Sequence, residues 1–437
     1  MNFFKIKYLE YFQLSIILLL PFLLITGPFL TDLSVSISGI ILIIFFIRLK
    51  NKIYFKNINI IFLFIFWYIF ILFSSLNSDN ILLSLESSLF YFRFGFLFLV
   101  IYFCCSNYDN FIKLFVLILC LCFIILFVDS CIQYLTNYNI LGWQTISHGR
   151  ISSFFKDELI MGSYVSRLIP TLIGLFLISF YKNKSFKKVL FITIMVFFSN
   201  ILVILSGERA ALFNIIAFNI FALIFSKSLR SIFLVNSLLF LVIGLSVIFS
   251  ENSIKDRLYK QTLENFNIFQ NQNSQNDEIS EVNNQKYIFS SIHQSTYLSA
   301  LDMFKNNVLI GVGPKNYRVV CQNDEYIHHF KEHGNQCLSH PHNTYMQLLA
   351  ETGIIGFLFV LTIFFIITFK LSKYIFIYSL SKSSDNLILE SKGFLLFAIF
   401  LTLFPFIPTG NFFNNWLSCL YFIPIGFLLY VSYKEKN

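Results

Sequence analysis

The stretch HPHNTYMQLLAETGIIGFLFVLTIFFIITFK, residues 340–370, passes from a dense polar run directly into an apolar segment. Residues 353–371 are long and apolar enough to cross a bilayer, which takes about 20 residues at roughly 1.5 Å each. The preceding NTYMQLLAE is compatible with a short helix, and Gly353 permits a break before the span. The stretch therefore predicts a membrane helix that carries polar chemistry at one end.

The composition of the whole chain points the same way. Hydrophobic residues make up 57% of the sequence and charged residues 13%, too little polar surface to cover a water-soluble globule. Apolar segments of spanning length occur near 10–30, 34–49, 58–76, 84–104, 111–129, 161–181, 188–205, 209–226, 231–249, 353–371, 392–408 and 412–432. We predict an all-α polytopic membrane protein with about 12 transmembrane helices.

The basic residues between these segments gather on one side of the membrane. They occupy RLKNKIYFKN (48–57), YKNKSFKK (181–188), KSLR (227–230), the lysines between 370 and 392, and the KEKN tail. The short loops TGPFLTD (26–32), SLNSDN (75–80) and PTGN (408–411) contain neither Lys nor Arg. The positive-inside rule then places both termini in the cytoplasm, with the first helix retained. The net charge of +9 reflects this topology, and no nucleic-acid partner is expected.

Two longer segments fall on the outer side, 129–160 and 250–352. We therefore divide the chain into residues 1–249 with nine helices and the loop 129–160, a large and partly helical outer loop 250–352, and residues 353–437 with three helices and a cytoplasmic tail. Within the large loop, NQNSQNDEISEVNNQ (271–285) has a composition typical of mobile segments.

The histidines all fall in these two outer loops: His148, His293, His328, His329, His333, His340 and His342. Histidine is disfavoured in lipid, and this alone accounts for HHFKEH (328–333) as well as any function does. It does not explain His340 and His342 beside a helix start, where an ideal helix of 3.6 residues per turn would place His340 about 200° around the axis from His342. A helix N-terminus favours anions, and an imidazole with a pKa near 6.5 can accept a proton. His342 is therefore a candidate to accept a proton at this helix start.

Cys321 and Cys337 are the two cysteines of the large outer loop, and in an oxidising compartment such a pair predicts a disulfide. The alternative is a zinc site made of these thiols with HHFKEH or with His340 and His342. Those spacings fit no common structural zinc site, so we predict no metal.

The run His342-Asn343, nine residues, then Gly353-x-x-Gly356 resembles the signature of the O-antigen ligases and the related O-antigen polymerases, integral membrane glycosyltransferases of the GT-C type. Further segments are similar to other parts of that superfamily. GVGPKNYR (311–318) resembles its glycine-rich element, SGER (206–209) its Ser-x-x-Arg at an outer helix start, and GRISSFFKDELIMGSYVSRLIP (149–170) the segment entering a middle helix.

The resemblance implies transfer of a glycan from undecaprenyl diphosphate to an acceptor sugar hydroxyl, at the periplasmic face of the bacterial inner membrane and without a cofactor. Ligases use lipid A-core as acceptor, and polymerases use another lipid-linked repeat. His342 matches the family's base and Arg209 its membrane-surface arginine, whose guanidinium can hold a diphosphate bidentately. The other interpretation of Arg209 is a helix-end anchor that snorkels to the interface.

The family also places a second cation ahead of its glycine-rich element, in an arginine-rich stretch. Here SSIHQSTYLSALDMF (290–304) offers His293 and no arginine, so His293, Arg318 or Lys315 is expected to replace it. Asn343 of the signature is a further candidate for substrate binding.

Arg93 lies within the apolar LFYFRFGFLF and is expected to face the interior of the bundle, since lipid exposure would cost about 2.5–3.5 kcal/mol. It can bind diphosphate, pair with Glu86 or Asp129, or snorkel. Arg167 and Glu158 stand near the same outer surface and either line the site or brace it.

Two non-enzymatic functions compete with glycosyl transfer. A flippase for lipid-linked oligosaccharides has no need of a large outer loop rich in histidine. A transporter would place ionisable groups at mid-bilayer, whereas these clusters lie outside it. Glycosyl transfer is favoured, and the His-Asn signature favours a ligase over a polymerase.

Overall fold

The computed structural model describes residues 3–48, 58–146, 149–180, 185–249, 291–380 and 387–434, together with 255, 256 and 258. These residues are helical or irregular and contain no β-strand. Ten of the described helices are long and apolar enough to cross a membrane. The prediction of an all-α polytopic membrane protein is therefore confirmed.

The membrane helices follow the predicted segments closely. They are α1 (Phe3–Thr26), α2 (Pro28–Arg48), α3 (Ile58–Leu76), α4 (Ile81–Ser88), η1 (Leu89–Tyr91), α5 (Phe92–Asn107), α6 (Phe111–Thr136), α7 (Met161–Phe180), α8 (Phe186–Ser206), α9 (Arg209–Phe225), α10 (Arg230–Phe249), α16 (Thr344–Leu380), α17 (Leu387–Thr402) and α18 (Asn415–Lys434). Each of the twelve predicted segments carries a helix, with α4, η1 and α5 sharing one span. The count of full-length spans is lower because α9 and α17 have only 17 and 16 residues.

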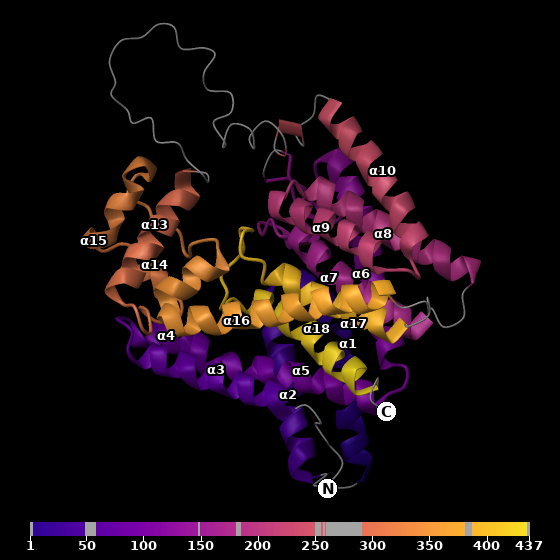
Figure 1. Cartoon of the computed structure of the whole chain (residues 1–437), viewed down its shortest axis with the longest axis horizontal. Helices are drawn as coiled ribbons and strands as arrows, with labels where there is room; N and C mark the ends of the chain where they lie inside the picture. The colour runs from indigo at the N-terminus through magenta and orange to yellow at the C-terminus, as the bar shows by residue number, and fades with distance from the viewer. Residues whose placement is uncertain are drawn as a thin grey trace, which may run out of the picture.

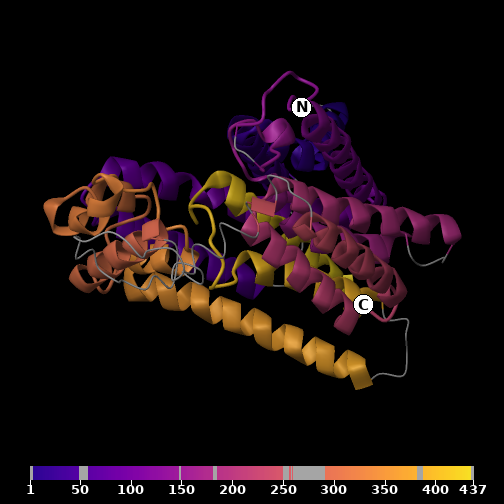
Figure 2. The ribbon, with the colours of Figure 1, turned by 90° about the horizontal axis from the view of Figure 1, so that it is seen from above.

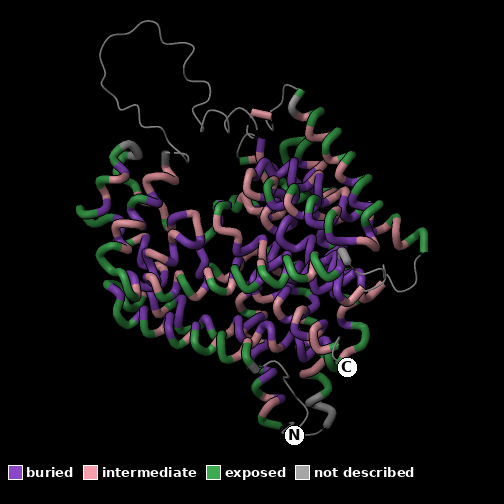
Figure 3. Tube along the Cα trace, viewed as in Figure 1, coloured by how far each residue is buried: buried purple, intermediate pink, exposed green. Residues whose placement is uncertain are grey.

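The centre of the bundle is formed by α7 and α17, which pack against each other. Gly174 of α7 permits this approach, since a Cβ there would lie 3.0 Å from the carbonyl oxygen of Ser391 in α17. Buried residues run through this centre, whereas α10 turns apolar side chains such as Leu238 and Val242 outward (Figure 3). Exposed apolar faces of this kind suit contact with lipid.

The outer segments add η2 (Ser153–Phe155), α13 (Ser291–Asn306), α14 (Tyr317–Val320), α15 (Asp324–Ile327) and η4 (His328–His333). The last four gather with the start of α16 at one end of the molecule (Figures 1 and 2). They share a small core of their own around Met303, Tyr317 and Tyr326. The described part of the predicted loop 250–352 is thus partly helical, and the domain boundaries themselves stay a prediction.

Several helix ends differ from the predicted segments, among them three that border irregular connections. The helix α6 continues to Thr136, past the predicted end at 129, while α17 stops at Thr402 and α18 begins only at Asn415. Residues 403–414 are an irregular connection even though most of them are apolar. Pro405 and Pro408 lack the N–H that a continuing helix would use, which accounts for the early stop.

Candidate functional site

The start of α16 fixes His342 in an unusual conformation. Asn343 caps the helix, because its Oδ1 accepts hydrogen bonds from the N–H groups of Tyr345 (2.9 Å) and Met346 (3.1 Å). His342, just before the cap, has a φ of 56°, in the left-handed region that few non-glycine residues adopt. Its carbonyl accepts a hydrogen bond from Thr409 N at 2.9 Å. Such conformations concentrate at functional sites, where the surroundings hold them in place.

Two further histidines lie beside His342. The ring centroid of His340 is 4.0 Å from that of His342, and the ring of His293 in α13 is 5.5 Å away. A helical backbone through residues 340–342 predicts that His340 points away from His342, and this prediction is wrong. The helix begins only at Thr344, so Pro341 is not in its first turn and the two rings can face each other.

Burial keeps these three imidazoles neutral. The pKa of His293 is lowered to about 4, first by burial and then by the charges of His342 and Arg209. The pKa of His340 falls to about 3, again by burial first and the charge of His342 second. Burial also lowers the pKa of His342. At pH 7 each ring therefore has a nitrogen lone pair available to accept a proton.

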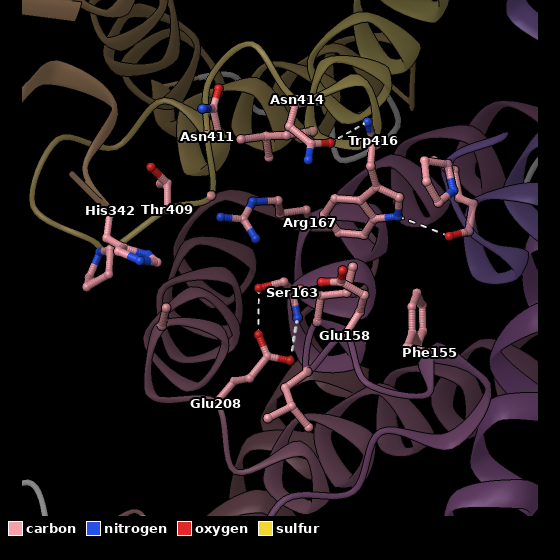
Figure 4. Close-up of a pocket in the computed structure, with 18 of the residues that line it drawn as sticks. Phe155, Glu158, Ser163, Arg167, Glu208, His342, Thr409, Asn411, Asn414 and Trp416 are labelled. Carbon is pink, nitrogen blue, oxygen red and sulfur yellow. Dashed lines mark hydrogen bonds between the residues drawn. The ribbon is translucent and has the colours of Figure 1, made fainter. Parts of the chain in front are cut away.

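A cavity of about 760 Å³ opens in front of these histidines. Its charged lining is Arg150, Lys156, Arg167, Arg209 and Arg318, set against Glu158 and Glu208. In Figure 4, Arg167 projects between the segment of His342 and Thr409 and that of Trp416. Its side chain is nearly buried, with 4% of the residue exposed. The excess of positive charge suits an anionic ligand.

The SGER segment joins two helices at the edge of this cavity. Glu208 Oε1 accepts a hydrogen bond from Gly162 N at 2.7 Å. Its Oε2 accepts one from Ser163 Oγ at 2.7 Å (Figure 4). These bonds fasten Glu208 to the first turn of α7, and Arg209 is the first residue of α9. Gly207 has a φ of 60°, and a Cβ there would come 2.3 Å from the carbonyl oxygen of Gly149. The glycine therefore lets the 149–151 segment pass close by.

The irregular connection 403–414 forms another wall of the cavity and is held by the start of α16. Asn343 Nδ2 donates a hydrogen bond to the carbonyl of Pro405 at 2.7 Å, and Tyr345 Oη donates one to the carbonyl of Leu403 at 2.8 Å. The hydroxyls of Thr344 and Thr409 are 3.0 Å apart. Asn343 thus has a structural role at this point, whatever it contributes to substrate binding.

The glycine-rich element packs backbone against backbone on α16. Val312 N donates to the carbonyl of Ala350 at 2.9 Å, and a Cβ on Gly311 would lie 2.4 Å from the carbonyl carbon of Glu351. Gly353 has a φ of 62° and breaks α16, and a Cβ on it would lie 2.4 Å from the carbonyl carbon of Leu309. The break that the sequence predicts at Gly353 is confirmed, and it serves this close approach.

A chain of buried hydrogen bonds through Glu351 and Gln347 connects the glycine-rich element to the connection 403–414. Glu351 Oε1 accepts a hydrogen bond from Tyr317 N at 3.2 Å, next to Arg318 of the cavity. Gln347 Nε2 donates to Glu351 Oε2 at 2.8 Å, while Gln347 Oε1 accepts from Phe412 N at 2.8 Å. Both side chains are fully buried. The glycine-rich element and the connection 403–414 are therefore positioned by the same turn of α16.

The cavity brings together five of the predicted site residues, namely His342, Arg209, Arg318, His293 and Arg167. It does not include Arg93, Lys315 or Asn343 in its lining.

Arg93 faces the interior as expected, and its side chain is 16% exposed, but its carboxylate partner is Asp32 at 3.4 Å. The predicted pairing of Arg93 with Glu86 or Asp129 is therefore wrong. Asp129 instead accepts hydrogen bonds from Ser153 Oγ and from the backbone N–H of Ile140.

The pKa of Lys315 is lowered by burial and then by the charge of Arg318.

Sequence reasoning missed Arg150 and the lining residues Thr409, Asn411, Asn414 and Trp416. Arg150 lies in the quoted 149–170 segment, on a side of the membrane where short loops lack arginine, and that contrast could have singled it out. Tryptophan is enriched at membrane interfaces, so Trp416 also carried a signal. Thr409, Asn411 and Asn414 gave no such signal, because the apolar residues around them were predicted to belong to two membrane spans.

Cys321 and Cys337 are adjacent in the structure, where both are free thiols. The Sγ of Cys337 donates a hydrogen bond to the carbonyl of Cys321 at 2.8 Å. Burial raises the pKa of both thiols. The predicted disulfide is not formed in this structure, but the two side chains are near enough for the pairing to stay a prediction.

Comparison with known families bears on the same region. A family model described as O-antigen ligase matches residues 193–361, which include Arg209, His293, Arg318 and His342. No curated protein matches the chain. The matched residues span SGER, the glycine-rich element and the His-Asn to Gly-x-x-Gly signature, and the structure gathers these three segments around one cavity. The chain is thus a polytopic membrane protein whose residues 193–361 match the O-antigen ligase family.

Proposed function

We propose that the chain is an O-antigen ligase-like glycosyltransferase that moves a glycan from undecaprenyl diphosphate to the sugar hydroxyl of lipid A-core. The observation that carries this proposal is the cavity in which a neutral, partly buried His342 stands in the same lining as Arg209, Arg167 and Arg318. Attack by a hydroxyl on the anomeric carbon of a glycosyl diphosphate is helped by a base that takes the hydroxyl proton. Guanidinium groups stabilise the charge of the diphosphate that leaves.

In the proposed reaction, the acceptor hydroxyl oxygen attacks the anomeric carbon of the glycan. His342 takes the hydroxyl proton while the bond between the anomeric carbon and the diphosphate oxygen breaks. The electron pair of that bond leaves with undecaprenyl diphosphate, and Arg209 stabilises the charge with its bidentate fork. Arg318, Arg167 and His293 are the further groups proposed for binding substrate, with Lys315, Arg93 and Asn343 placed outside the lining.

The site is proposed to face the periplasm, with the protein in the bacterial inner membrane and both termini in the cytoplasm. The charge asymmetry of the short loops supports this orientation. The ligands are then membrane lipids that carry sugars, and the large outer segment stands where these head groups lie.

The alternative acceptor is a second lipid-linked repeat, which would make the chain an O-antigen polymerase. The test is in vitro transfer by purified protein with a lipid-linked glycan, supplied with lipid A-core in one reaction and a second lipid-linked repeat in the other. Product on lipid A-core alone supports the ligase, product on the repeat alone supports the polymerase, and no product with either refutes the proposal. The proposed chemistry uses no metal, so transfer should persist in EDTA.

A further inference from the structure

A second cluster of ligating side chains lies apart from the cavity. It consists of Asp302 near the end of α13 and of His328 and His329 at the start of η4, with one ligand atom from each within 4.8 Å of the others. Among the residues that the structure describes, this is the one group of three or more His, Cys, Asp or Glu side chains with such spacing. None of the three lines the cavity.

The geometry of the cluster is close to that of a metal site. His329 Nε2 is 2.7 Å from Asp302 Oδ2, and the rings of His328 and His329 have centroids 4.0 Å apart. Two ligands on a tetrahedral zinc at about 2.0–2.1 Å lie roughly 3.3 Å from each other. A small rotation of the Asp302 and His329 side chains would therefore admit the ion between them.

We propose that Asp302, His328 and His329 bind one Zn²⁺ ion that ties η4 to α13, with water in the fourth position. Two imidazole nitrogens and a carboxylate oxygen form a donor set that zinc favours over magnesium or calcium, which prefer oxygen ligands throughout. Asp302 and His328 are 26 residues apart in sequence, so the ion would cross-link two elements that already meet through the contact between His329 and Asp302.

Lys305 sets the strength of this site. Its Nζ lies 2.7 Å from Asp302 Oδ1, the carboxylate oxygen that does not face His329, and its side chain is 71% exposed. A divalent cation on Oδ2 would be repelled by this ammonium group, which must move into solvent or remain at a cost. Zinc affinity is consequently lower than the ligands alone would give, and removing the charge of Lys305 should raise it.

The site stands away from the proposed chemistry but on the same helix. His293, which lines the cavity, precedes Asp302 by nine residues in α13, about 13 Å along the helix axis at a rise of roughly 1.5 Å per residue. The zinc ion therefore takes no part in glycosyl transfer. It would hold the far end of the helix that presents His293.

The experiment is a zinc titration of the full-length protein in nanodiscs, competed against a chromophoric chelator. The protein is purified without a histidine tag, because a tag would bind zinc itself. The wild type should bind one equivalent. His328→Ala, which changes an exposed side chain, should weaken binding by at least about tenfold, as expected when a ligand is lost.

Two further variants make the test specific. Lys305→Gln should bind zinc more tightly than the wild type, and His340→Gln, in the cavity, should bind it as the wild type does. Zinc should also raise the unfolding temperature of the wild type and not that of His328→Ala. Absence of a bound equivalent, or equal affinity in the wild type, His328→Ala and Asp302→Asn, would overturn the proposal. Neither result depends on transfer activity, so it leaves the proposed function to its own test.

Discussion

Replacement of His342 by asparagine separates its chemistry from its backbone conformation. His342 has a φ of 56°, and asparagine is among the residues that adopt this region most readily. Alanine adopts this region less readily than histidine or asparagine, so a loss of activity in His342→Ala would have two causes. With His342→Asn, the carbonyl that accepts from Thr409 N keeps its place, and only the imidazole is lost.

The expected loss follows from the role of a general base. Such a group contributes about 100- to 10,000-fold, or roughly 2.7–5.4 kcal/mol at 1.36 kcal/mol per factor of ten. His340 is the nearer of the two neighbouring imidazoles that can moderate this loss, since its ring is 4.0 Å away and that of His293 is 5.5 Å away. The Nε2 of His340 is buried without a hydrogen-bond partner among the described residues. His340→Gln alone should cost much less than His342→Asn, and the double variant should cost more than either.

The pH dependence provides a second readout. Burial lowers the pKa of His342 below its usual value near 6.5, and transfer requires the neutral ring. The value of kcat/KM should be level from pH 7 upward and should fall as the pH decreases through that lowered pKa. This acid limb should disappear from the residual activity of His342→Asn, and it should remain in His340→Gln.

The assay measures transfer from a lipid-linked glycan by each purified variant. Normal membrane insertion of the variant is checked by its yield from membranes and by its elution as a single species in size-exclusion chromatography. Near-normal transfer by His342→Asn would refute the assignment of the base. A loss in His340→Gln equal to that predicted for His342→Asn, with the acid limb abolished, would move the role to His340.

Three further predictions concern charge, thiols and sidedness. Arg209→Lys should lower transfer at least about tenfold despite the retained charge, because an ammonium group cannot form the bidentate fork; transfer at the wild-type rate would favour the helix-end anchor. Protein from oxidising cells should yield linked Cys321 and Cys337 peptides in non-reducing mass spectrometry, and free thiols at both positions would exclude the disulfide. A cysteine introduced at Ser280 should react with a membrane-impermeant maleimide in intact cells whose outer membrane alone is permeabilised, and one at Ser383 should not. Both serines lie outside the described residues, and the reverse pattern would contradict the proposed orientation.

Local sequence features predicted most of the helical architecture. A run of apolar residues is sufficient to specify a membrane helix, since in lipid the backbone must satisfy its own hydrogen bonds. The break at Gly353 was also visible, because a glycine at the boundary between polar and apolar residues is where a helix can be interrupted. The positions of His342 and Arg209 in one cavity followed from a resemblance rather than from any local rule.

The features that sequence could not supply depend on contacts between distant segments. Hydropathy treats 403–408 as the end of a span, whereas hydrogen bonds from Asn343 and Tyr345 hold it as part of the cavity wall. The partner of Arg93 is Asp32, which belongs to a different helix and has no sequence relation to it. The error about His340 arose because an ideal helix, at about 100° per residue, was assumed for His340 and His342, which precede the cap Asn343 where the helix begins.

The location of the cavity follows from where helices are interrupted. Helix α8 ends at Gly207, α16 breaks at Gly353, and α17 stops before Pro405, and each interruption releases backbone N–H and C=O groups that lipid cannot satisfy. The structure satisfies such groups internally: Thr409 N donates to the carbonyl of His342 and Phe412 N to Gln347. Polar side chains are therefore needed where the apolar helices are interrupted. The place of the proposed site for charged, sugar-bearing lipids is consistent with that requirement, because Thr409, whose N–H completes the backbone here, also holds the backbone of His342.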